Sequence, residues 1–428
     1  GGVERGRSRR GASCSTWSGL SLAGIGLIDR SERVTRRPPR RDSNTICPLI
    51  KYLGSKRVLL PAILSLVREA SPHARSVLDL FSGTSRVGHA LKREGYRVIA
   101  NDHNAYALTL ARCYVQADAE EVLADATRLI DELNRLPGKP GYITETFCLR
   151  SRFFQPQNGE RIDAIREEIA RKGLGPEIEA VLLVSLMQAA DRVDSTTGVQ
   201  MAYLKSWAPR SFRSLELRVP EVLPRAAAGK GEAHGLDALG AAATLEADVA
   251  YIDPPYNQHA YLGNYHIWET LVRWDKPEVF GVACKRSDVR ERRSPFNSRR
   301  LSAGALRAVL ERVRAPVVVL SFNDEGFLSR EDLAAMLGDT FPGAEVTEHA
   351  HAFQRYVGAR IGIYNPRGEK VGRVGRLTNH ELLYVVRRRT DEPERKAACT
   401  LASAPSDQAG LGIVPRIESR MPCGEPGG

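Results

Sequence analysis

Short apolar runs recur along this chain, separated by longer stretches in which apolar and polar positions follow a helical period. The runs predict buried strands at residues 76–80, 97–101, 248–253, 316–322 and 381–386, and residues 360–364 could pair beside the last of these. Residues 87–93 have a helical pattern and connect the first two runs. Strand, turn and helix in this repeated order favour an α/β fold with a parallel, doubly wound sheet.

Residues 118–224 have a different pattern. They contain helical patterns at residues 161–172 and 176–193 and no convincing strand run. We therefore expect a helical domain inserted between two strands of the sheet. Residues 47–117 and 225–390 would then form the sheet domain on either side of it.

Composition separates the two ends of the chain from its middle. Residues 1–46 hold ten arginines against four acidic residues, and residues 391–428 are rich in Pro, Gly, Ser and Ala. Both ends are predicted to be disordered, the first as a basic arm. The formal charge of +11 favours an anionic partner, but more than half of it lies in the basic arm. Charge alone therefore supports a nucleic-acid partner only weakly.

Cysteine usage and hydropathy exclude some classes of protein. The seven cysteines are dispersed, and no pair has the close spacing of a metal site. Such usage is typical of reduced thiols in the cytosol, and no metal is expected. No apolar run reaches the roughly 18 residues of a membrane span, so no membrane partner is expected.

The first chemical motif is the turn that follows the strand at residues 76–80. Here Gly83 lets the backbone approach a ligand closely, and N–H groups at the start of the following helix face the same point. About twenty residues after Asp79, the second strand ends at Asp102, where a carboxylate can accept hydrogen bonds from both ribose hydroxyls of a nucleoside. The turn and the acid together predict a nucleoside cofactor.

The second motif is Asp253-Pro254-Pro255-Tyr256, at the end of the predicted strand 248–253. One group that this motif could act on is the exocyclic amino group of adenine. Its nitrogen is a poor nucleophile because its lone pair is delocalised into the ring. The Asp253 carboxylate and the Pro254 carbonyl could accept from its N–H groups and draw the nitrogen toward tetrahedral geometry. Consecutive prolines hold these acceptors rigidly, and Tyr256 offers a flat face on which a flipped base can stack.

Two shorter segments are weaker signals. Tyr52, within residues 51–56, could pack on an adenine ring, and Gly54-Ser55 could let the backbone approach a carboxylate. Asp237 could accept from the amino group of a cofactor's adenine. Considered alone, each of these is equally compatible with an ordinary loop or surface residue.

Taken in order, these motifs resemble the DNA adenine methylases of the Dam type. That pattern runs from Lys-aromatic-x-Gly-Gly/Ser-Lys through a Phe-x-Gly turn, Asn-Asp, a helical insert and Asp-Ala/Phe to Asp-Pro-Pro-Tyr. The corresponding residues of this chain are 51–56, 81–83, 101–102, 118–224, 237–238 and 253–256. Further stretches resemble the restriction–modification branch of that family, at residues 153–166, 203–205 and 257–271. Two departures stand out: the turn has one glycine where two are usual, and Ser55 stands where Gly is common.

The resemblance implies a Rossmann-like methyltransferase sheet with an inserted helical target-recognition domain. It implies S-adenosylmethionine as cofactor, held by Tyr52, Gly54, Ser55, Lys56, Asp79, Phe81, Ser82, Gly83, Thr84, Asp102 and Asp237. It also implies base flipping and direct methyl transfer without a metal. The implied partners are double-stranded DNA and a cognate restriction endonuclease, and the implied location is the bacterial cytoplasm, at the nucleoid.

DNA contacts are harder to place. Residues 285–300 hold seven basic residues against two acidic ones and follow the second motif, so they could lie along phosphates. A solvated basic loop would have the same composition. The candidates for DNA contact are Lys51, Arg192, Lys205, Lys285 and Arg286.

Other functions remain open at this point. Ribosomal RNA guanine or adenine methyltransferases combine the same two motifs, although the helical insert in the interval of about 170 residues between Asp79 and Asp253 favours a DNA target. A DNA cytosine amino-methyltransferase motif usually begins with Ser, and a protein-glutamine methyltransferase motif with Asn. The alternative from another class is a non-catalytic DNA-binding module with a decayed site, and the intact residues 253–256 argue against it.

Overall fold

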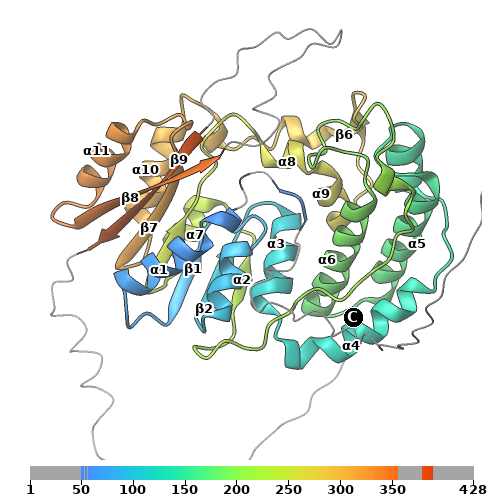
Figure 1. The fold of residues 1–428 in the computed structure, drawn as a ribbon, viewed down its shortest axis with the longest axis horizontal. Coiled ribbons are helices and arrows are strands. Elements are labelled where there is room, and N and C mark those ends of the chain that lie inside the picture. Colours follow the sequence, from blue (N-terminus) through green and yellow to red (C-terminus); the bar gives the residue numbers. More distant parts are fainter. Residues whose placement is uncertain (1–49, 53, 55, 355–377, 389–428) are drawn as a thin grey trace, which may run out of the picture. The chain divides into compact units, whose positions relative to one another are not determined.

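The computed structural model describes residues 50–354, except 53 and 55, and residues 378–388 (Figure 1). The predicted basic arm (1–46), the predicted tail (391–428) and the predicted strand at 360–364 lie outside the described residues. So does Ser55.

A seven-stranded sheet with the strand order β3-β2-β1-β4-β7-β9-β8 forms the centre of the fold (Figure 1). Its strands are β1 (Ser76–Asp79), β2 (Arg97–Asn101), β3 (Glu232–His234), β4 (Val249–Ile252), β7 (Val317–Asn323), β8 (Glu345–Gln354) and β9 (Thr378–Arg387). The first five strands in this order pair in parallel, whereas β9 is antiparallel to β7 and β8 is antiparallel to β9. The predicted α/β fold of Rossmann-like type is confirmed.

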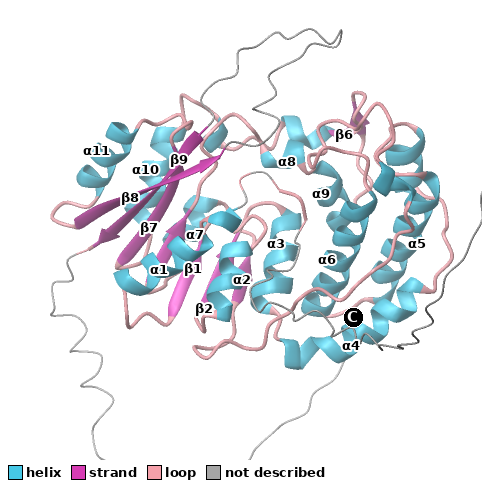
Figure 2. Cartoon of the chain, in the orientation of Figure 1, coloured by secondary structure: helices cyan, strands magenta, loops and turns pink. Residues whose placement is uncertain are grey.

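Helices cover both faces of this sheet (Figure 2). On one face, α7 (Ala238–Thr244), α10 (Ser302–Arg312) and α11 (Arg330–Thr340) share a buried apolar cluster with strand residues such as Leu78. On the other face, α1 (Leu60–Ala70) contacts β7 and β9, and α2 (Arg86–Arg93) contacts β1 and β2. Burial from both sides explains why the central strands are continuous apolar runs.

The strands β3 and β8 were not expected from the sequence pattern. Both are edge strands of the sheet. The three residues of β3 are half-buried, and β8 carries several polar residues. Pairing with a neighbouring strand, and not a local apolar run, makes these segments extended.

The helical stretch predicted at residues 118–224 lies between β2 and β3. After α3 (Ala105–Ala111) come α4 (Ala119–Asn134), α5 (Pro156–Lys172) and α6 (Pro176–Val193), with the short helical turns η2 (Arg112–Gln116), η3 (Thr144–Leu149) and η4 (Pro209–Phe212). Both α5 and α6 begin with a proline, at the helical position where no N–H partner is needed. The two helices predicted from the apolar period are confirmed, although α5 begins five residues earlier than the pattern indicates.

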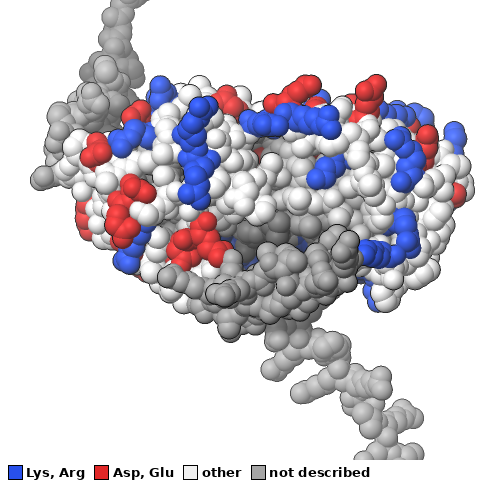
Figure 3. Space-filling model, turned by 90° about the horizontal axis from the view of Figure 1, so that it is seen from above, with Lys and Arg blue, Asp and Glu red and all other residues white. Residues whose placement is uncertain are grey.

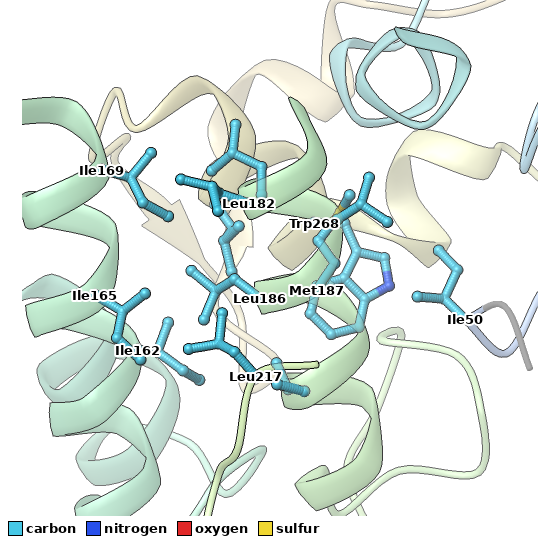
Figure 4. Packing of buried hydrophobic residues seen from close by; sticks show 14 of the residues in the cluster. Ile50, Ile162, Ile165, Ile169, Leu182, Leu186, Met187, Leu217 and Trp268 are labelled. Carbon is cyan, nitrogen blue, oxygen red and sulfur yellow. The ribbon is translucent and has the colours of Figure 1, made fainter. Parts of the chain in front are cut away.

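This helical stretch shares its core with the segment that follows β4. Figure 4 shows α5 and α6 packed side by side, with Trp268 of α9 (His266–Arg273) close to α6. One buried cluster includes all the labelled residues, which are Ile50, Ile162, Ile165, Ile169, Leu182, Leu186, Met187, Leu217 and Trp268. The helices therefore depend on α9 for part of their apolar contact.

The segment between β4 and α10 is made of short elements. They are α8 (Tyr261–Asn264), α9, β5 (Val279–Phe280), β6 (Lys285–Arg286), η5 (Ser287–Arg290) and η6 (Pro295–Asn297). Near the start of the described chain, η1 (Lys56–Val58) precedes α1. None of the helices in the described part is long and apolar enough to cross a membrane.

Candidate active site

The carboxyl ends of β1, β2 and β4 meet at one cavity of about 710 Å³. In an open parallel sheet this edge is where ligands bind. Its lining brings together most residues predicted from the motifs, namely Tyr52, Gly54, Lys56, Asp79, Phe81, Ser82, Gly83, Thr84, Asp102, Asp237, Asp253 and Pro255. Of the second motif, Pro254 and Tyr256 are outside this lining.

The glycine turn after β1 is tied to the end of β2. Gly83 has a φ of +50°, in the left-handed region that favours glycine, and its N–H donates to Asp102 Oδ2 at 3.0 Å. Asp102 Oδ1 accepts from the backbone N–H of Asn104 at 2.9 Å. Burial raises the pKa of Asp102, although these hydrogen bonds oppose the shift. The two features that predicted a nucleoside cofactor thus form one hydrogen-bonded unit.

Asp79 binds the helix that follows the same turn. Its side chain is buried, and Oδ2 accepts from the backbone N–H of Gly88 in α2 at 3.1 Å. Burial, together with the nearby Asp253, raises the pKa of Asp79 to about 8. Asp79 therefore holds the start of α2 against β1.

Asp237 is the N-cap residue of α7. Its side chain accepts from the backbone N–H groups of Leu239 and Gly240, at 3.0 and 3.1 Å. This capping explains why the helix begins at Ala238. The same residue lines the cavity.

Tyr52 belongs to a cluster of tyrosine side chains beside the cavity. Its ring stacks on Tyr265 (centroids 4.5 Å apart) and on Tyr261 (5.2 Å apart), and its hydroxyl lies 3.2 Å from that of Tyr106. Tyr261 and Tyr265 fall in the stretch 257–271 that carries the family resemblance. Tyr106 was missed, because it stands within a helical pattern without a motif of its own.

Asp253 follows β4 directly and lies beside a lysine. Lys56 Nζ is 3.0 Å from Asp253 Oδ1, and it forms a second ion pair with Glu381 on β9. Burial would lower the pKa of Lys56, but the carboxylates of Asp253 and Glu381 outweigh it and raise the pKa well above its usual value. Lys56, assigned by resemblance to the cofactor, thus also contacts the predicted catalytic acid.

The pKa of the Asp253 carboxyl is shifted toward neutral pH. Burial raises its pKa to about 6; Lys56 opposes this shift, and Glu381 adds to it. Glu381 was missed as a site residue. The available signal was an acidic residue at the start of the otherwise apolar run 381–386.

The ring of Tyr256 also lies near Lys56. The ammonium is 5.7 Å from the Tyr256 ring centroid, and that ring packs on Phe322 with centroids 5.7 Å apart. The Tyr256 carbonyl accepts from the backbone N–H of Phe327 at 2.9 Å, which fixes the loop after the two prolines.

Residues 52–330 match the model of the D12 class N6 adenine-specific DNA methyltransferases. This chain belongs to that family. The resemblance drawn from the motifs is therefore confirmed, and the alternatives of an RNA methyltransferase and a non-catalytic module are not favoured.

Three relatives of this D12-class chain are modification enzymes. Type II methyltransferase M.FokI of Planomicrobium okeanokoites is 28% identical over 305 residues, which are 67% of this chain and 46% of that protein. Modification methylase StsI of Streptococcus sanguinis is 29% identical over 303 residues, again 67% and 46%. Type II methyltransferase M.NlaIII of Neisseria lactamica is 29% identical over 292 residues, 65% and 85%. The chain thus spans about half the length of the first two.

Two basic residues that are candidates for DNA contact form ion pairs within the structure. Arg286 is 1% exposed and pairs with Asp275 at 2.7 Å and Asp288 at 3.0 Å, so it holds its own segment together. Lys51 pairs with Asp191 and Asp194 at 3.2 and 3.1 Å, which ties the segment before η1 to the end of α6. Contact of these two residues with DNA stays a prediction, and the sequence alone does not show which carboxylates approach each cation.

The other candidates differ in exposure. Lys205 is exposed, Lys285 is half-buried, and Arg192 is half-buried and donates to the Glu216 carbonyl at 2.6 Å. Figure 3 looks from above onto the end of the structure where α8 and β6 lie in Figure 1. It shows Lys and Arg side chains spread over this face among Asp and Glu.

Proposed function

We propose that this chain transfers a methyl group from S-adenosylmethionine to the exocyclic amino nitrogen of adenine, within a specific sequence of double-stranded DNA. The observation that carries the proposal is that Asp253 and the Gly83 turn line one cavity at the carboxyl edge of the sheet. The cavity thereby offers two features together. Asp253 can accept from the amino group of the base, and the turn is suited to a nucleoside cofactor. The names of the relatives, all modification enzymes, agree with it.

The cavity fits S-adenosylmethionine. Ser82 Oγ is buried and has no hydrogen-bond partner among the described residues, so a polar group of a ligand could satisfy it. Asp102 would accept from the ribose hydroxyls, and Asp237 from the adenine amino group. By family resemblance the remaining contacts would come from Tyr52, Gly54, Ser55, Lys56, Asp79, Phe81, Gly83 and Thr84. When bound, the cofactor supplies an electrophilic methyl group on a positively charged sulfur.

The chain itself would activate the amino group by accepting hydrogen bonds from it, and the nitrogen, on gaining the methyl group, would lose one of its two protons to water. Asp253 and the Pro254 carbonyl would each accept one N–H, which localises the nitrogen lone pair toward the methyl group. Such acceptors act best when they are already in place, because the site then does not reorganise as the reaction proceeds. Pro254 and Pro255 provide this rigidity, since the pyrrolidine ring fixes φ. The target base would leave the duplex, at a cost of a few kcal/mol, and stack on Tyr256.

DNA would dock on the face that carries the cavity mouth. We assign phosphate contacts to Lys205, Lys285 and Arg192, and target recognition to the helical stretch 118–224. Residues 47–117 and 225–390 would then be the catalytic domain. A cognate restriction endonuclease, as in Type II modification systems, is the proposed second partner, and chromosomal DNA in the bacterial cytoplasm, at the nucleoid, is the proposed place of action.

The test is methylation of a genome. The full chain is expressed in a bacterial host that lacks adenine methylation, and the genomic DNA is sequenced with a method that detects modified bases. We expect N6-methyladenine confined to one short motif, and none with the variant Asp253→Ala. Unmodified DNA from a folded protein that binds the cofactor would overturn the proposal, and ribosomal RNA would then be assayed in the same way.

A further inference from the structure

Asp253 and Lys56 are joined by a third charged side chain, that of Glu381. Glu381, on β9, is 2% exposed and pairs with Lys56 Nζ. Its carboxylate oxygens also accept from Ser321 Oγ (2.9 Å) and Asn323 Nδ2 (3.1 Å), both on β7. Since β7 lies between β4 and β9, Glu381 reaches Lys56 from a strand two positions away from the one that Asp253 follows. Its carboxylate is therefore held in one orientation by three partners.

Lys56 is shared between two carboxylates. Its Nζ lies 3.0 Å from Asp253 Oδ1 and also contacts Glu381 Oε1, while its side chain is 7% exposed. A buried ammonium with a single carboxylate would pair fully with it, because opposite charges attract strongly where water is excluded. The second carboxylate takes part of this attraction, so the cluster keeps a net negative charge. Burying that additional charge is costly, which points to a role in the chemistry.

We infer that Glu381 is a positioning residue that draws the Lys56 ammonium toward β9 and leaves the Asp253 carboxylate free to accept the amino group of the target base. This inference rests on the proposed function, in which Asp253 accepts from adenine. Without Glu381, Lys56 would pair with Asp253 alone and compete with the base for its oxygens. With Glu381 present, Lys56 still favours the ionised form of Asp253. It does not occupy both Asp253 carboxylate oxygens, so the base can donate to them.

Other titratable groups also face Asp253, from each of the surrounding elements. They are Asp79 at the end of β1, Tyr251 on β4, Tyr256 after β4 and Tyr261 on α8. Burial raises the pKa of Tyr256 to about 12 and those of the other two tyrosines well above their usual value, so all three stay neutral. Burial also raises the pKa of Asp79 to about 8, so this acid is mostly protonated at pH 7. These four neighbours are therefore mostly uncharged, and the charges beside Asp253 are those of Lys56 and Glu381.

The test measures the ionisation of Asp253 directly. The full chain is labelled with ¹³C at the aspartate side-chain carboxyls, and the Asp253 signal is assigned by its loss in Asp253→Asn. We expect Glu381→Gln to lower the pKa of Asp253, because a negative neighbour is lost and Lys56 is released toward Asp253. Lys56→Met should raise it. In turnover assays at pH 8, Glu381→Gln should lower kcat roughly tenfold, as a weakened charged hydrogen bond would, and leave KM for DNA within about twofold.

A matched control is Glu348→Gln, because Glu348 lies on the edge strand β8 and pairs with Arg330 instead of a cavity residue. We expect it to leave both the Asp253 titration and kcat unchanged. An Asp253 titration that Glu381→Gln does not shift, in a protein of normal stability, would overturn the inference.

Two further outcomes keep the inference and the proposed function apart. If Glu381→Gln does not fold, Glu381→Asp replaces it: the charge is kept but withdrawn by one methylene, so a smaller fall in the Asp253 pKa is expected, and no fall overturns the inference. A wild-type protein that methylates no DNA would refute the proposed function, while the carboxyl titration would still decide whether Glu381 controls Asp253.

Discussion

If Asp253 accepts from the target base, as proposed, it has to be ionised inside a cavity that disfavours its charge. Burial raises its pKa to about 6, and only the protonated form is uncharged. Because the carboxylate is the form that accepts most strongly, activity is lost as pH falls through this pKa. We expect kcat to be constant above pH 7 and to fall about tenfold per pH unit well below 6. The measurement is kcat against pH at saturating DNA and cofactor; a flat profile down to pH 5 would contradict the role of Asp253.

Two aspartates at the same cavity should fail in different ways. Asp253→Ala should lower kcat by at least about a hundredfold, as loss of a preorganised group does, and leave the Kd for S-adenosylmethionine within about threefold. Asp102→Ala should raise that Kd by about tenfold or more, because charged hydrogen bonds to the ribose are lost. Equilibrium binding of labelled cofactor and single-turnover methylation separate the two. Loss of cofactor binding by a folded Asp253→Ala protein would show that its role is misassigned.

Among the elements, the part of the β4–α10 segment around β6 is held by ion pairs, whereas α9 packs into the apolar core. Its strands β5 and β6 have two residues each, too short to be stable alone. The Arg286 guanidinium binds Asp275 on one side and Asp288 on the other, and also donates to Thr270 of α9 at 3.2 Å. One buried cation thereby fixes β6, the start of η5 and the end of α9.

We therefore expect neighbouring basic residues of β6 to behave differently. Arg286→Ala removes the buried cation between Asp275 and Asp288, which keep the more exposed Arg273 and Arg292 as partners, and should lower the free energy of unfolding by about 3 kcal/mol. The matched variant Lys285→Ala should change it by less than about 0.5 kcal/mol and weaken DNA binding instead. Urea unfolding followed by circular dichroism measures both. Equal effects on stability would show that Arg286 has no special structural role.

For the molecule as a whole, the charge of +11 matters only where cations remain available to DNA. Lys205 is exposed, on the loop after α6. If it contacts a phosphate, Lys205→Ala should weaken binding to all sequences alike. It should also reduce the slope of log affinity against log salt by about 1.

A control for this measurement is Arg314→Ala. Arg314 pairs with Glu246 at 3.2 Å and lies just before β7, at the amino edge of the sheet, away from the cavity. Its removal should leave the salt slope unchanged. Equal slopes for Lys205→Ala and the wild type would remove Lys205 from the DNA-contacting surface.

Local patterns in the sequence determined the central strands, the helices α5 and α6 and the two motifs. Strands buried on both faces must be apolar throughout, and helices packed on one another repeat apolar residues with the helical period, so both are readable without a structure. The Gly83 turn and residues 253–256 are also local, because each follows its strand directly. Their meeting at one edge follows from parallel strand order.

Only the tertiary structure decided which charges meet. Glu381 is 128 positions from Asp253, yet both reach Lys56, and the acidic partners that bury Arg286 and engage Lys51 are likewise invisible in a list of residues. The edge strands β3 and β8 exist only because a neighbour offers its hydrogen bonds. Contacts across the sheet depend on how strands are ordered and registered, and that information is distributed over the whole chain. The sequence therefore determined the motifs, and the fold decided which side chains surround them.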